Sequence, residues 1–393
     1  MHVKELIAKF QNYFLEQNLS DIRIFFSPGR VNLIGEHIDY NGGYVFPASL
    51  SIGTYLLVQK RTDNKLIFVS ENFPGKSYER SVENLYFNEA DGWSNYPKGV
   101  FDAFKTFTNV ELTGMNLYFW GNIPNGSGLS SSASIELVTA TMLNEVYEQH
   151  IDKVELVKLA QKVENHYIGV NCGIMDQFAI GMGKKECAII LDCASLEFDY
   201  VPLELKTTKI VIMNTNKKRM LADSKYNERR SECEKALAIF QTKLDIQNLC
   251  DMNLDLFDIN VSLLEGHDVL TQRARHVVSE NERTKEAVSA LRNGDLEHFG
   301  KLLNASHKSL KEDYEVTGVE LDTLAETAQL QAGCLGARMT GAGFGGCALA
   351  IVEEVEIESF IAAVGVIYKN KTGVEASFYV VETGSGSTEL FGR

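Results

Sequence analysis

The strongest constraint on the fold is a change of hydrophobic period between residues 116 and 150. Asn116–Trp120 is a short run of aromatic and branched residues, which is typical of a strand. Ser131–His150 carries apolar residues three and four positions apart, which predicts an amphipathic helix. A Gly- and Ser-rich turn, Pro124–Ser134, joins the two segments. The chain therefore mixes strands and helices, and this turn leads from a strand directly into a helix.

The same alternation runs along the first half of the chain. Apolar spacing near the N-terminus predicts a surface helix rather than a secretory signal, and Val154–Tyr167 repeats the helical pattern. Four further runs have the composition of strands: Ile22–Phe26, Tyr55–Gln59, Leu66–Ser70 and Cys187–Leu191.

The pattern changes near residues 200–206, and all six Pro lie at or before Pro202. The expected order beyond this point is strand, helices, strand, strand, helix, strand, which matches the split βαβ (ferredoxin-like) arrangement. At roughly 150 residues per domain, a chain of 393 residues has room for two or three domains. We predict two, residues 1–205 and 206–393. The expected elements of the second half are Lys209–Asn214, Leu221–Phe240, Val269–Arg292, Ala337–Thr340, Cys347–Val352, Val355–Lys369 and Ala376–Val381.

Charge and cysteine content exclude several classes of protein. The formal net charge is −15, which repels nucleic acid. The seven Cys contain no CxxC pair, so reduced thiols in a cytosol fit better than a zinc site or a disulfide framework. The longest late uncharged run, Met339–Val352, has 14 residues and is too short to span a bilayer. We therefore expect a soluble, cytoplasmic protein with neither a nucleic-acid nor a membrane partner.

The first of three glycine-bearing motifs is Ser27–Tyr40, where a Pro-Gly turn follows a strand. Arg30, Glu36, His37 and Asp39 crowd into ten residues. Carboxylates accept hydrogen bonds and His can donate or accept them, so the group suits the hydroxyls of a sugar. A structural turn with an internal Arg–carboxylate pair explains the pattern equally well.

The second motif is the turn at Pro124–Ser134. Gly126 and Gly128 let the backbone approach phosphate oxygens, and the helix N-terminus that follows favours an anion. A serine hydroxyl there can cap the helix or ligate Mg²⁺. The motif is neither a Walker loop nor a dinucleotide fingerprint. A Ser-capped helix after a flexible turn is the alternative.

Two further segments carry candidate residues. Met339–Cys347 has four Gly in six residues, which indicates either a close approach to a ligand or a tight hairpin. Asp176 lies among apolar neighbours, where a carboxylate must be paired or liganded, so it is either a catalytic acid or a satisfied core Asp. Glu164 is a candidate metal ligand or, alternatively, a surface carboxylate.

The order of these motifs resembles that of the GHMP small-molecule kinases and, among them, the galactokinases. GRVNLIGEHIDY resembles the sugar signature, PNGSGLSSSAS the phosphate loop and TGAGFGGC the C-terminal glycine motif. CGIMDQ and DSKYNERR also resemble galactokinase segments, so the likeness runs from about residue 25 to residue 347. Ala342 and Ser127 depart from the residues frequent in the family.

The resemblance implies an α+β protein with the two-domain GHMP kinase fold. Its N-terminal domain would be ribosomal protein S5 domain 2-like, its C-terminal domain ferredoxin-like, and the active site would lie in the cleft. The implied activity is ATP-dependent phosphorylation of the C1 hydroxyl of α-D-galactose, with ATP and Mg²⁺ as cofactors and a monomer as the expected state. Two alternatives stay open at this point: an N-acetylgalactosamine kinase and a non-catalytic galactose sensor.

The resemblance also implies individual roles. Asp176 matches the catalytic carboxylate and Arg30 its neighbouring arginine. Trp93 is expected at the border of the adenine pocket. The implied sugar ligands are Glu36, His37, Ile38, Asp39, Gly173 and Tyr226. The implied ATP contacts are Ser70, Gly126, Ser127, Gly128, Leu129, Ser130, Ser131 and Ser132, and the implied Mg²⁺ ligands are Ser132 and Glu164.

Overall fold

A computed structural model describes residues 2–15, 21–124, 127–217 and 222–391. Its first half is built on a six-stranded sheet in the order β13-β1-β3-β6-β4-β5. Neighbouring strands are antiparallel except for the parallel pair β4 and β6. The strands are β1 (Arg23–Asn32), β3 (Pro47–Lys60), β4 (Lys65–Ser70), β5 (Ser77–Ser81), β6 (Met115–Gly121) and β13 (Thr388–Phe391).

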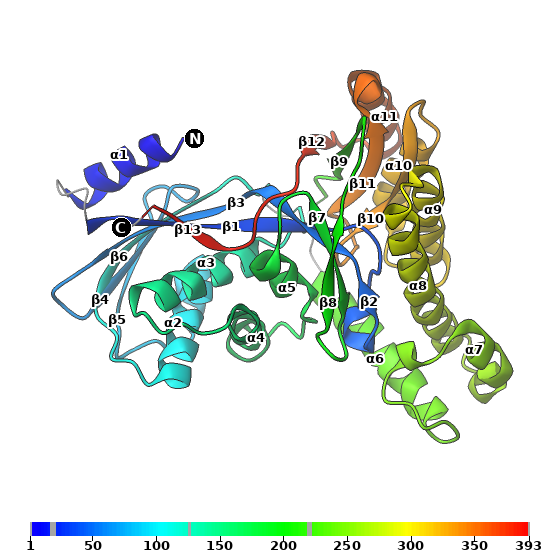
Figure 1. The fold of residues 1–393 in the computed structure, drawn as a ribbon, viewed down its shortest axis with the longest axis horizontal. Helices are drawn as coiled ribbons and strands as arrows, with labels where there is room; N and C mark the ends of the chain where they lie inside the picture. The colour runs from blue at the N-terminus through cyan, green and yellow to red at the C-terminus, as the bar shows by residue number, and fades with distance from the viewer. Residues whose placement is uncertain (1, 16–20, 125–126, 218–221, 392–393) are drawn as a thin grey trace.

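Helices cover both faces of this sheet (Figure 1). On one face, α1 (Val3–Phe14) buries Leu6 and Phe10 completely against the strands, so the expected surface helix packs at its apolar side. On the other face, α3 contacts β1 and β3 and shares a core with its neighbours. The helices of that face are α2 (Asn95–Thr108), α3 (Ser131–Val146), α4 (Lys153–Lys162) and α5 (Met175–Met182).

Two helices of the first half differ from the sequence expectation at their ends. α3 ends at Val146 rather than at residue 150, because Glu148 and His150 adopt positive φ angles that leave the helix. The helix expected over Val154–Tyr167 is α-helical only to Lys162 and continues as one π-helical turn, η4 (Val163–Ile168). Single π turns recur at functional sites.

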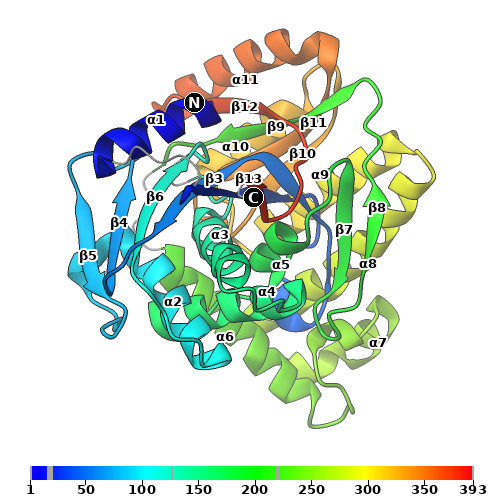
Figure 2. The ribbon, with the colours of Figure 1, turned by 60° about the vertical axis from the view of Figure 1, so that its left-hand side comes forward.

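The second half contains an antiparallel four-stranded sheet in the order β10-β11-β9-β12. The chain passes through strand, helices, strand, strand, helix, strand, and the central pair is the first and third strands, which confirms the ferredoxin-like expectation. Figure 2 shows its helices beside this sheet. The elements are β9 (Thr208–Asn214), β10 (Cys334–Thr340), β11 (Cys347–Glu353), β12 (Ser377–Val381), α6 (Ala222–Phe240), α7 (Leu254–Asn260), α8 (Asp268–Arg292), α9 (Leu296–Glu312), α10 (Gly318–Gln329) and α11 (Ile357–Thr372).

The two halves share buried surface. A small sheet of β2 (Tyr44–Val45), β7 (Cys187–Asp192) and β8 (Phe198–Pro202) lies between them, and one apolar core joins strands of both. The last strand, β13, returns to pair with β1. The division at residues 205 and 206 stays a prediction. Among the described residues, no helix is long and apolar enough to cross a membrane.

Candidate active site

An arginine and an aspartate from distant parts of the chain form a two-point ion pair. Arg30 Nε donates to Asp176 Oδ1 at 2.8 Å, and Nη2 donates to Oδ2 at 2.9 Å. The Arg30 side chain is 4% exposed, whereas that of Asp176 is 31% exposed. A bidentate pair fixes the orientation of both groups. Asp176 is therefore held firmly while part of its carboxylate stays open to a ligand.

The local backbone places Arg30 against the predicted phosphate loop. The expected turn at Pro28 and Gly29 is wrong, because β1 runs through both residues with only an irregularity between Pro28 and Arg30. A Cβ on Gly29 would lie 2.9 Å from the carbonyl oxygen of Leu129. Glycine permits this close approach. The backbone N–H of Arg30 donates to the Leu129 carbonyl at 3.2 Å, and Nη1 donates to the Gly128 carbonyl at 2.7 Å. Arg30 thus ties Asp176 to the loop.

The first turn of α3 is open to an anion. Ser130 precedes the helix with a φ of 60°, and its hydroxyl donates to Asp176 Oδ2 instead of capping the helix. The N–H groups of the first turn carry the positive end of the helix dipole, which suits phosphate oxygens. Ser127 is buried and its hydroxyl has no hydrogen-bond partner among the described residues. Gly126 lies outside the described residues.

Oxygen ligands gather beside this turn. Glu164 on η4 is 7% exposed and accepts a hydrogen bond from Gln177 Nε2 at 2.7 Å. Burial raises the pKa of Glu164 to about 7, against the opposing effect of a hydrogen bond with Ser132. Glu136 is fully buried nearby, and burial followed by the charge of Glu164 raises its pKa. A hydroxyl and a carboxylate are ligands that Mg²⁺ prefers, so Ser132 and Glu164 fit this ion.

Asp39 lies close to Asp176. It packs directly on Gly173, where a Cβ would lie 1.8 Å from Asp39 Oδ2. Burial raises the pKa of Asp39 to about 7, and the charge of Asp176 is the second cause. The absence of a side chain at Gly173 is therefore what leaves room for this carboxylate.

Aromatic residues lie next to Asp39. His37 Nε2 donates to the Ala342 carbonyl at 3.2 Å, so Nδ1 accepts from the Tyr40 hydroxyl at 2.9 Å. Burial lowers the pKa of His37 to about 3, in accord with a neutral ring. The ring of Tyr226 lies 5.5 Å from that of His37, between centroids. Ile38 is fully buried.

Glu36 occupies a different position. Its carboxylate accepts hydrogen bonds from the Gly341 N–H at 2.6 Å and from Asn32 Nδ2 at 2.9 Å. Thr340 Oγ1 donates to it at 3.2 Å, and Arg338 Nη2 lies 3.6 Å away. Burial raises the pKa of Glu36. Glu36 therefore joins the sugar-signature segment to the glycine hairpin between β10 and β11.

A cavity of about 190 Å³ opens beside the start of α3. Ser70, Ser131 and Ser132 line it together with an aromatic pair. The rings of Phe73 and Trp93 are nearly parallel, at 13°, with centroids 6.3 Å apart. Aromatic walls next to an anion-binding helix end suit a nucleotide.

A second group of potential metal ligands lies elsewhere. His307, Asp322 and Glu326 bring ligand atoms within 4.8 Å of one another. The Met339 N–H donates to His307 Nδ1 at 3.3 Å, so the neutral ring keeps its proton on the Nε2 that faces Asp322. Lys311 forms an ion pair with Glu326 and lies 3.8 Å from Asp322. The ammonium takes the place of a cation, and we assign no metal here.

The structure thus brings Arg30, Asp176 and Ser130 together. Glu36 instead contacts Arg338 and Gly341 of the second half of the chain. Sequence reasoning missed two residues of this region. Gln177, which follows Asp176 directly, orients Glu164. Arg338 is fully buried in β10, and its Nη1 donates to two carbonyls of β1 and the loop beyond. A charged residue within an apolar strand was the available signal for it.

The chain is similar to known proteins over almost its whole length. Three family models match: the galactokinase galactose-binding signature at residues 8–60, the N-terminal domain of GHMP kinases at residues 95–184 and their C-terminal domain at residues 287–369. A galactokinase of Ligilactobacillus salivarius is 52% identical over 391 residues, covering 99% of this chain and 100% of its own. A galactokinase of Lactiplantibacillus plantarum is 54% identical over 392 residues, covering 99% and 100%.

The chain belongs to the galactokinase family. Among solved structures, the galactokinase of Lactococcus lactis, complexed with galactose, matches with a TM-score of 0.95 at 52% identity, covering 99% of this chain and 100% of that one. The mevalonate kinase of Methanococcus jannaschii has a TM-score of 0.69 at 20% identity, with 94% and 100% covered, and shares the fold. The matches to both GHMP kinase domains, together with this shared fold, confirm the expected fold class.

Proposed function

We propose that this protein transfers the γ-phosphoryl group of ATP to the C1 hydroxyl of α-D-galactose, giving galactose 1-phosphate and ADP. The observation that carries the proposal is that Arg30 and Ser130 both donate hydrogen bonds to Asp176 at the N-terminus of α3. The full-length similarity to galactokinases, one of them complexed with galactose, supports the choice of sugar.

Asp176 would accept the proton of the C1 hydroxyl, or hold that hydroxyl in line with the phosphoryl group. Its partial exposure gives a substrate access, and the bidentate contact with Arg30 keeps its carboxylate in one orientation. A positioned general base typically contributes about 10²–10⁴-fold to rate.

The start of α3 would hold the phosphates. Phosphoryl transfer depends mainly on alignment and on neutralising charge. The N–H groups from Gly128 to Ser132 and the guanidinium of Arg30 supply both without a Walker lysine. Gly341 closes the loop from the other half of the molecule, since a Cβ there would lie 3.2 Å from the Gly128 carbonyl oxygen.

Ser132 and Glu164 would hold Mg²⁺. When bound, Mg²⁺ neutralises phosphate charge and orients the ATP. Gln177 keeps the Glu164 carboxylate turned towards Ser132 through its hydrogen bond. Ser70 and Trp93 would contact the base and ribose in the cavity beside α3.

The remaining predicted residues would form the sugar pocket. Asp39 would accept hydrogen bonds from sugar hydroxyls, and Gly173 would give a backbone contact beside it. Tyr226 and His37 would form an aromatic wall. The backbone of Ile38 would close the inner end of the sugar pocket, and the buried Glu36 would support that end by joining it to the glycine hairpin.

The activity test is direct. The purified protein is mixed with ATP, Mg²⁺ and galactose, and ³¹P NMR follows the products. The expected result is equal amounts of galactose 1-phosphate and ADP. ADP formation equal to that of a sample without sugar would reject the proposal. A parallel competition with N-acetylgalactosamine should leave galactose as the preferred acceptor.

We also propose that the protein is a monomer and works in the cytoplasm. All seven cysteines are free thiols, which suits a reducing compartment. Analytical ultracentrifugation should give a mass near 43.8 kDa, and a mass of twice that value would contradict the monomer.

A further inference from the structure

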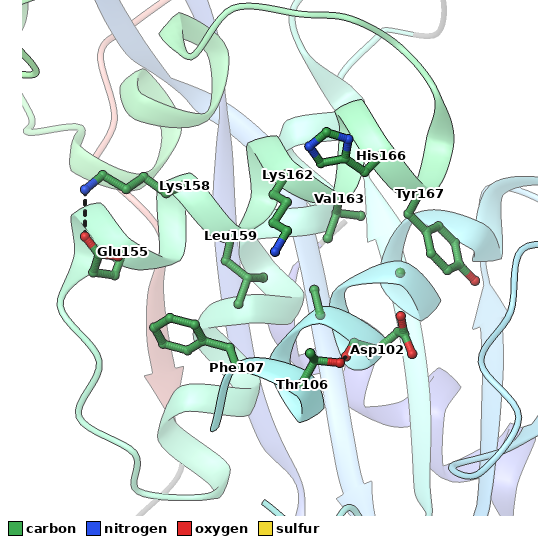
Figure 3. A pocket seen from close by; sticks show the side chains of 12 residues that line it. Asp102, Thr106, Phe107, Glu155, Lys158, Leu159, Lys162, Val163, His166 and Tyr167 are labelled. Atoms are coloured by element: carbon green, nitrogen blue, oxygen red, sulfur yellow. Dashed lines mark hydrogen bonds and ion pairs between the residues drawn. The ribbon is translucent and has the colours of Figure 1, made fainter. Parts of the chain in front are cut away.

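A cavity of about 620 Å³ lies outside the site described above, between α2 and the α4–η4 segment (Figure 3). This volume is in the range of small-molecule sites, about 300–1,000 Å³. Its floor is apolar and includes Ala103, Leu159 and Val163. Phe107 lines it as well and is 55% exposed, so an aromatic ring stands without full cover.

The charged groups of the cavity are unequally paired. Lys158 forms an ion pair with Glu155 at 2.7 Å. Lys162 lines the same wall, but its ammonium has no hydrogen bond or ion pair with any residue that the structure describes. Figure 3 shows its ammonium reaching into the middle of the cavity. Phe107 and Lys158 lie towards one end and Asp102 and Tyr167 towards the other.

This distribution of apolar and charged side chains favours a ligand that has an apolar body and an anionic group. An aromatic or aliphatic body would cover Phe107 and Leu159 at the end away from Asp102. An anionic group on that body would then reach Lys162, where a charge-assisted hydrogen bond forms. The net charge of the whole protein is −15, so attraction for an anion here is local to Lys162, because Glu155 already pairs with Lys158. Asp102 lines the other end of the cavity and would repel an anion there.

The cavity shares a wall with the candidate active site. Tyr167 and His166 of η4 line the cavity, while Glu164 of the same turn faces Ser132 and Gln177. The turn has little room on the α2 side, since a Cβ on Gly99 would lie 2.6 Å from the Tyr167 ring. A molecule that moved this turn would therefore move Glu164.

We propose that the groove between α2 and the α4–η4 segment binds a small organic anion with an apolar ring, and that binding there alters the position of Glu164. The first half of the proposal is independent of the proposed function. The second half depends on it, because it takes Glu164 as a ligand of the Mg²⁺ used with ATP.

Binding is tested on the full-length protein by ligand-observed NMR, with galactose and ADP at saturation to fill the active site. The probes are benzoate and phenyl phosphate, and benzyl alcohol is the neutral control. We expect both anions to bind and benzyl alcohol to bind at least several-fold more weakly. Preference for one anion identifies the carboxylate or the phosphate as the favoured group.

Matched variants locate the site. Lys162→Gln should weaken binding of the anions about tenfold, because a neutral amide cannot form the charge-assisted hydrogen bond. Asp102→Asn should strengthen it, and Ala103→Trp should abolish it by filling the cavity. Lys153→Gln on the same helix, outside the cavity, should change nothing. Equal affinity in wild type, Lys162→Gln and Ala103→Trp, with each variant folded by circular dichroism, would overturn the site.

The coupling has its own readout. Saturating benzoate should change the KM for Mg²⁺ in the kinase assay at least twofold and should do nothing in Ala103→Trp. Binding without any change in this KM would overturn the coupling and leave the binding site standing. Absence of kinase activity would reject the proposed function, and the NMR titrations would still decide the binding.

Discussion

Two arginine–carboxylate pairs in this molecule have opposite environments. Arg30 and Asp176 make two hydrogen bonds, and the Asp176 side chain is 31% exposed. Arg338 and Glu36 lie 3.6 Å apart with side chains 0% and 2% exposed. The first pair is partly open to solvent, and the second is buried between the first half of the chain and the glycine hairpin of the second half.

The two environments indicate that one sequence motif, Ser27–Tyr40, supplies both a residue for the reaction and a residue that stabilises the fold. Arg30 and Glu36 lie six positions apart in the same sequence motif, yet one orients a carboxylate towards substrate and the other joins two parts of the fold. An exposed and orientated acid can exchange a proton with a ligand. A buried acid that is saturated by its own chain mainly specifies packing, and breaking its pair leaves an unpaired charge inside.

The largest expected effect is on the open pair. Asp176→Asn keeps the shape but removes the acceptor of the proton, so kcat for galactose should fall by about 10²–10⁴-fold. Steady-state assays measure kcat, and calorimetric titration should show ATP and galactose still binding. The control is Asp245→Asn at an exposed position, which should leave kcat unchanged. Normal turnover of Asp176→Asn would show that this residue is not catalytic and that the two ion pairs do not differ in role.

The sealed pair should act mainly on stability. Glu36→Ala leaves Arg338 buried without its partner, which should cost about 3–5 kcal/mol of unfolding free energy. Urea denaturation measures this change, and Asp176→Asn is the comparison and should lose clearly less. A stability loss at Glu36 no greater than that at Asp176 would show that the two environments do not differ as described.

The third effect is steric. Gly173→Ala places a Cβ where Asp39 Oδ2 now lies, so the carboxylate must move away from the sugar pocket. Breaking a hydrogen bond to the sugar in this way costs about 1–3 kcal/mol, so the KM for galactose should rise roughly tenfold while the KM for ATP stays constant. Gly365→Ala is the control, since its Cβ would meet Phe378 at an ordinary 3.5 Å. An unchanged KM in Gly173→Ala would place Asp39 outside the pocket.

The smallest effect concerns pH. Folding raises the pKa of Asp39 from 3.8 to about 7, so the native state favours the protonated form and this group's contribution to stability falls as pH rises between these values. The ionised form accepts stronger hydrogen bonds from hydroxyls. The KM for galactose should therefore be several-fold lower at pH 8 than at pH 6.

Asp39→Asn provides the check on this assignment. The variant should lose the pH dependence of KM, and it should gain melting temperature over wild type more at pH 8 than at pH 5. A pH dependence of the KM that persists in Asp39→Asn would assign the titration to another group.

The sequence predicted those elements whose hydrophobic period is strong, such as β9, β11 and α8. It did not predict the return of β13 to β1, because pairing between positions more than three hundred residues apart leaves no local pattern. The π turn at η4 was also missed, since its residues continue a normal helical spacing. Helices α2, α5, α7, α9 and α10 were not predicted individually.

The candidate site was predictable mainly through the resemblance to a family. Periodicity alone could not show that Arg30 meets Asp176 across 146 positions. Ser130 was expected only as an ATP contact of the phosphate loop, and its hydroxyl donates to Asp176 without capping α3. The sealed state of Glu36 depends on Arg338 and Gly341, which only the folded chain brings to it.

A crystal structure with galactose and a non-hydrolysable ATP analogue would test most directly whether Asp176 and the start of α3 act together on the substrate. We predict that the C1 hydroxyl of galactose lies within hydrogen-bond distance of an Asp176 oxygen, about 2.6–3.2 Å, with the γ-phosphate at the start of α3 on the same side. A galactose whose C1 faces away from Asp176, or a nucleotide whose phosphates lie away from Gly128–Ser132, would contradict it.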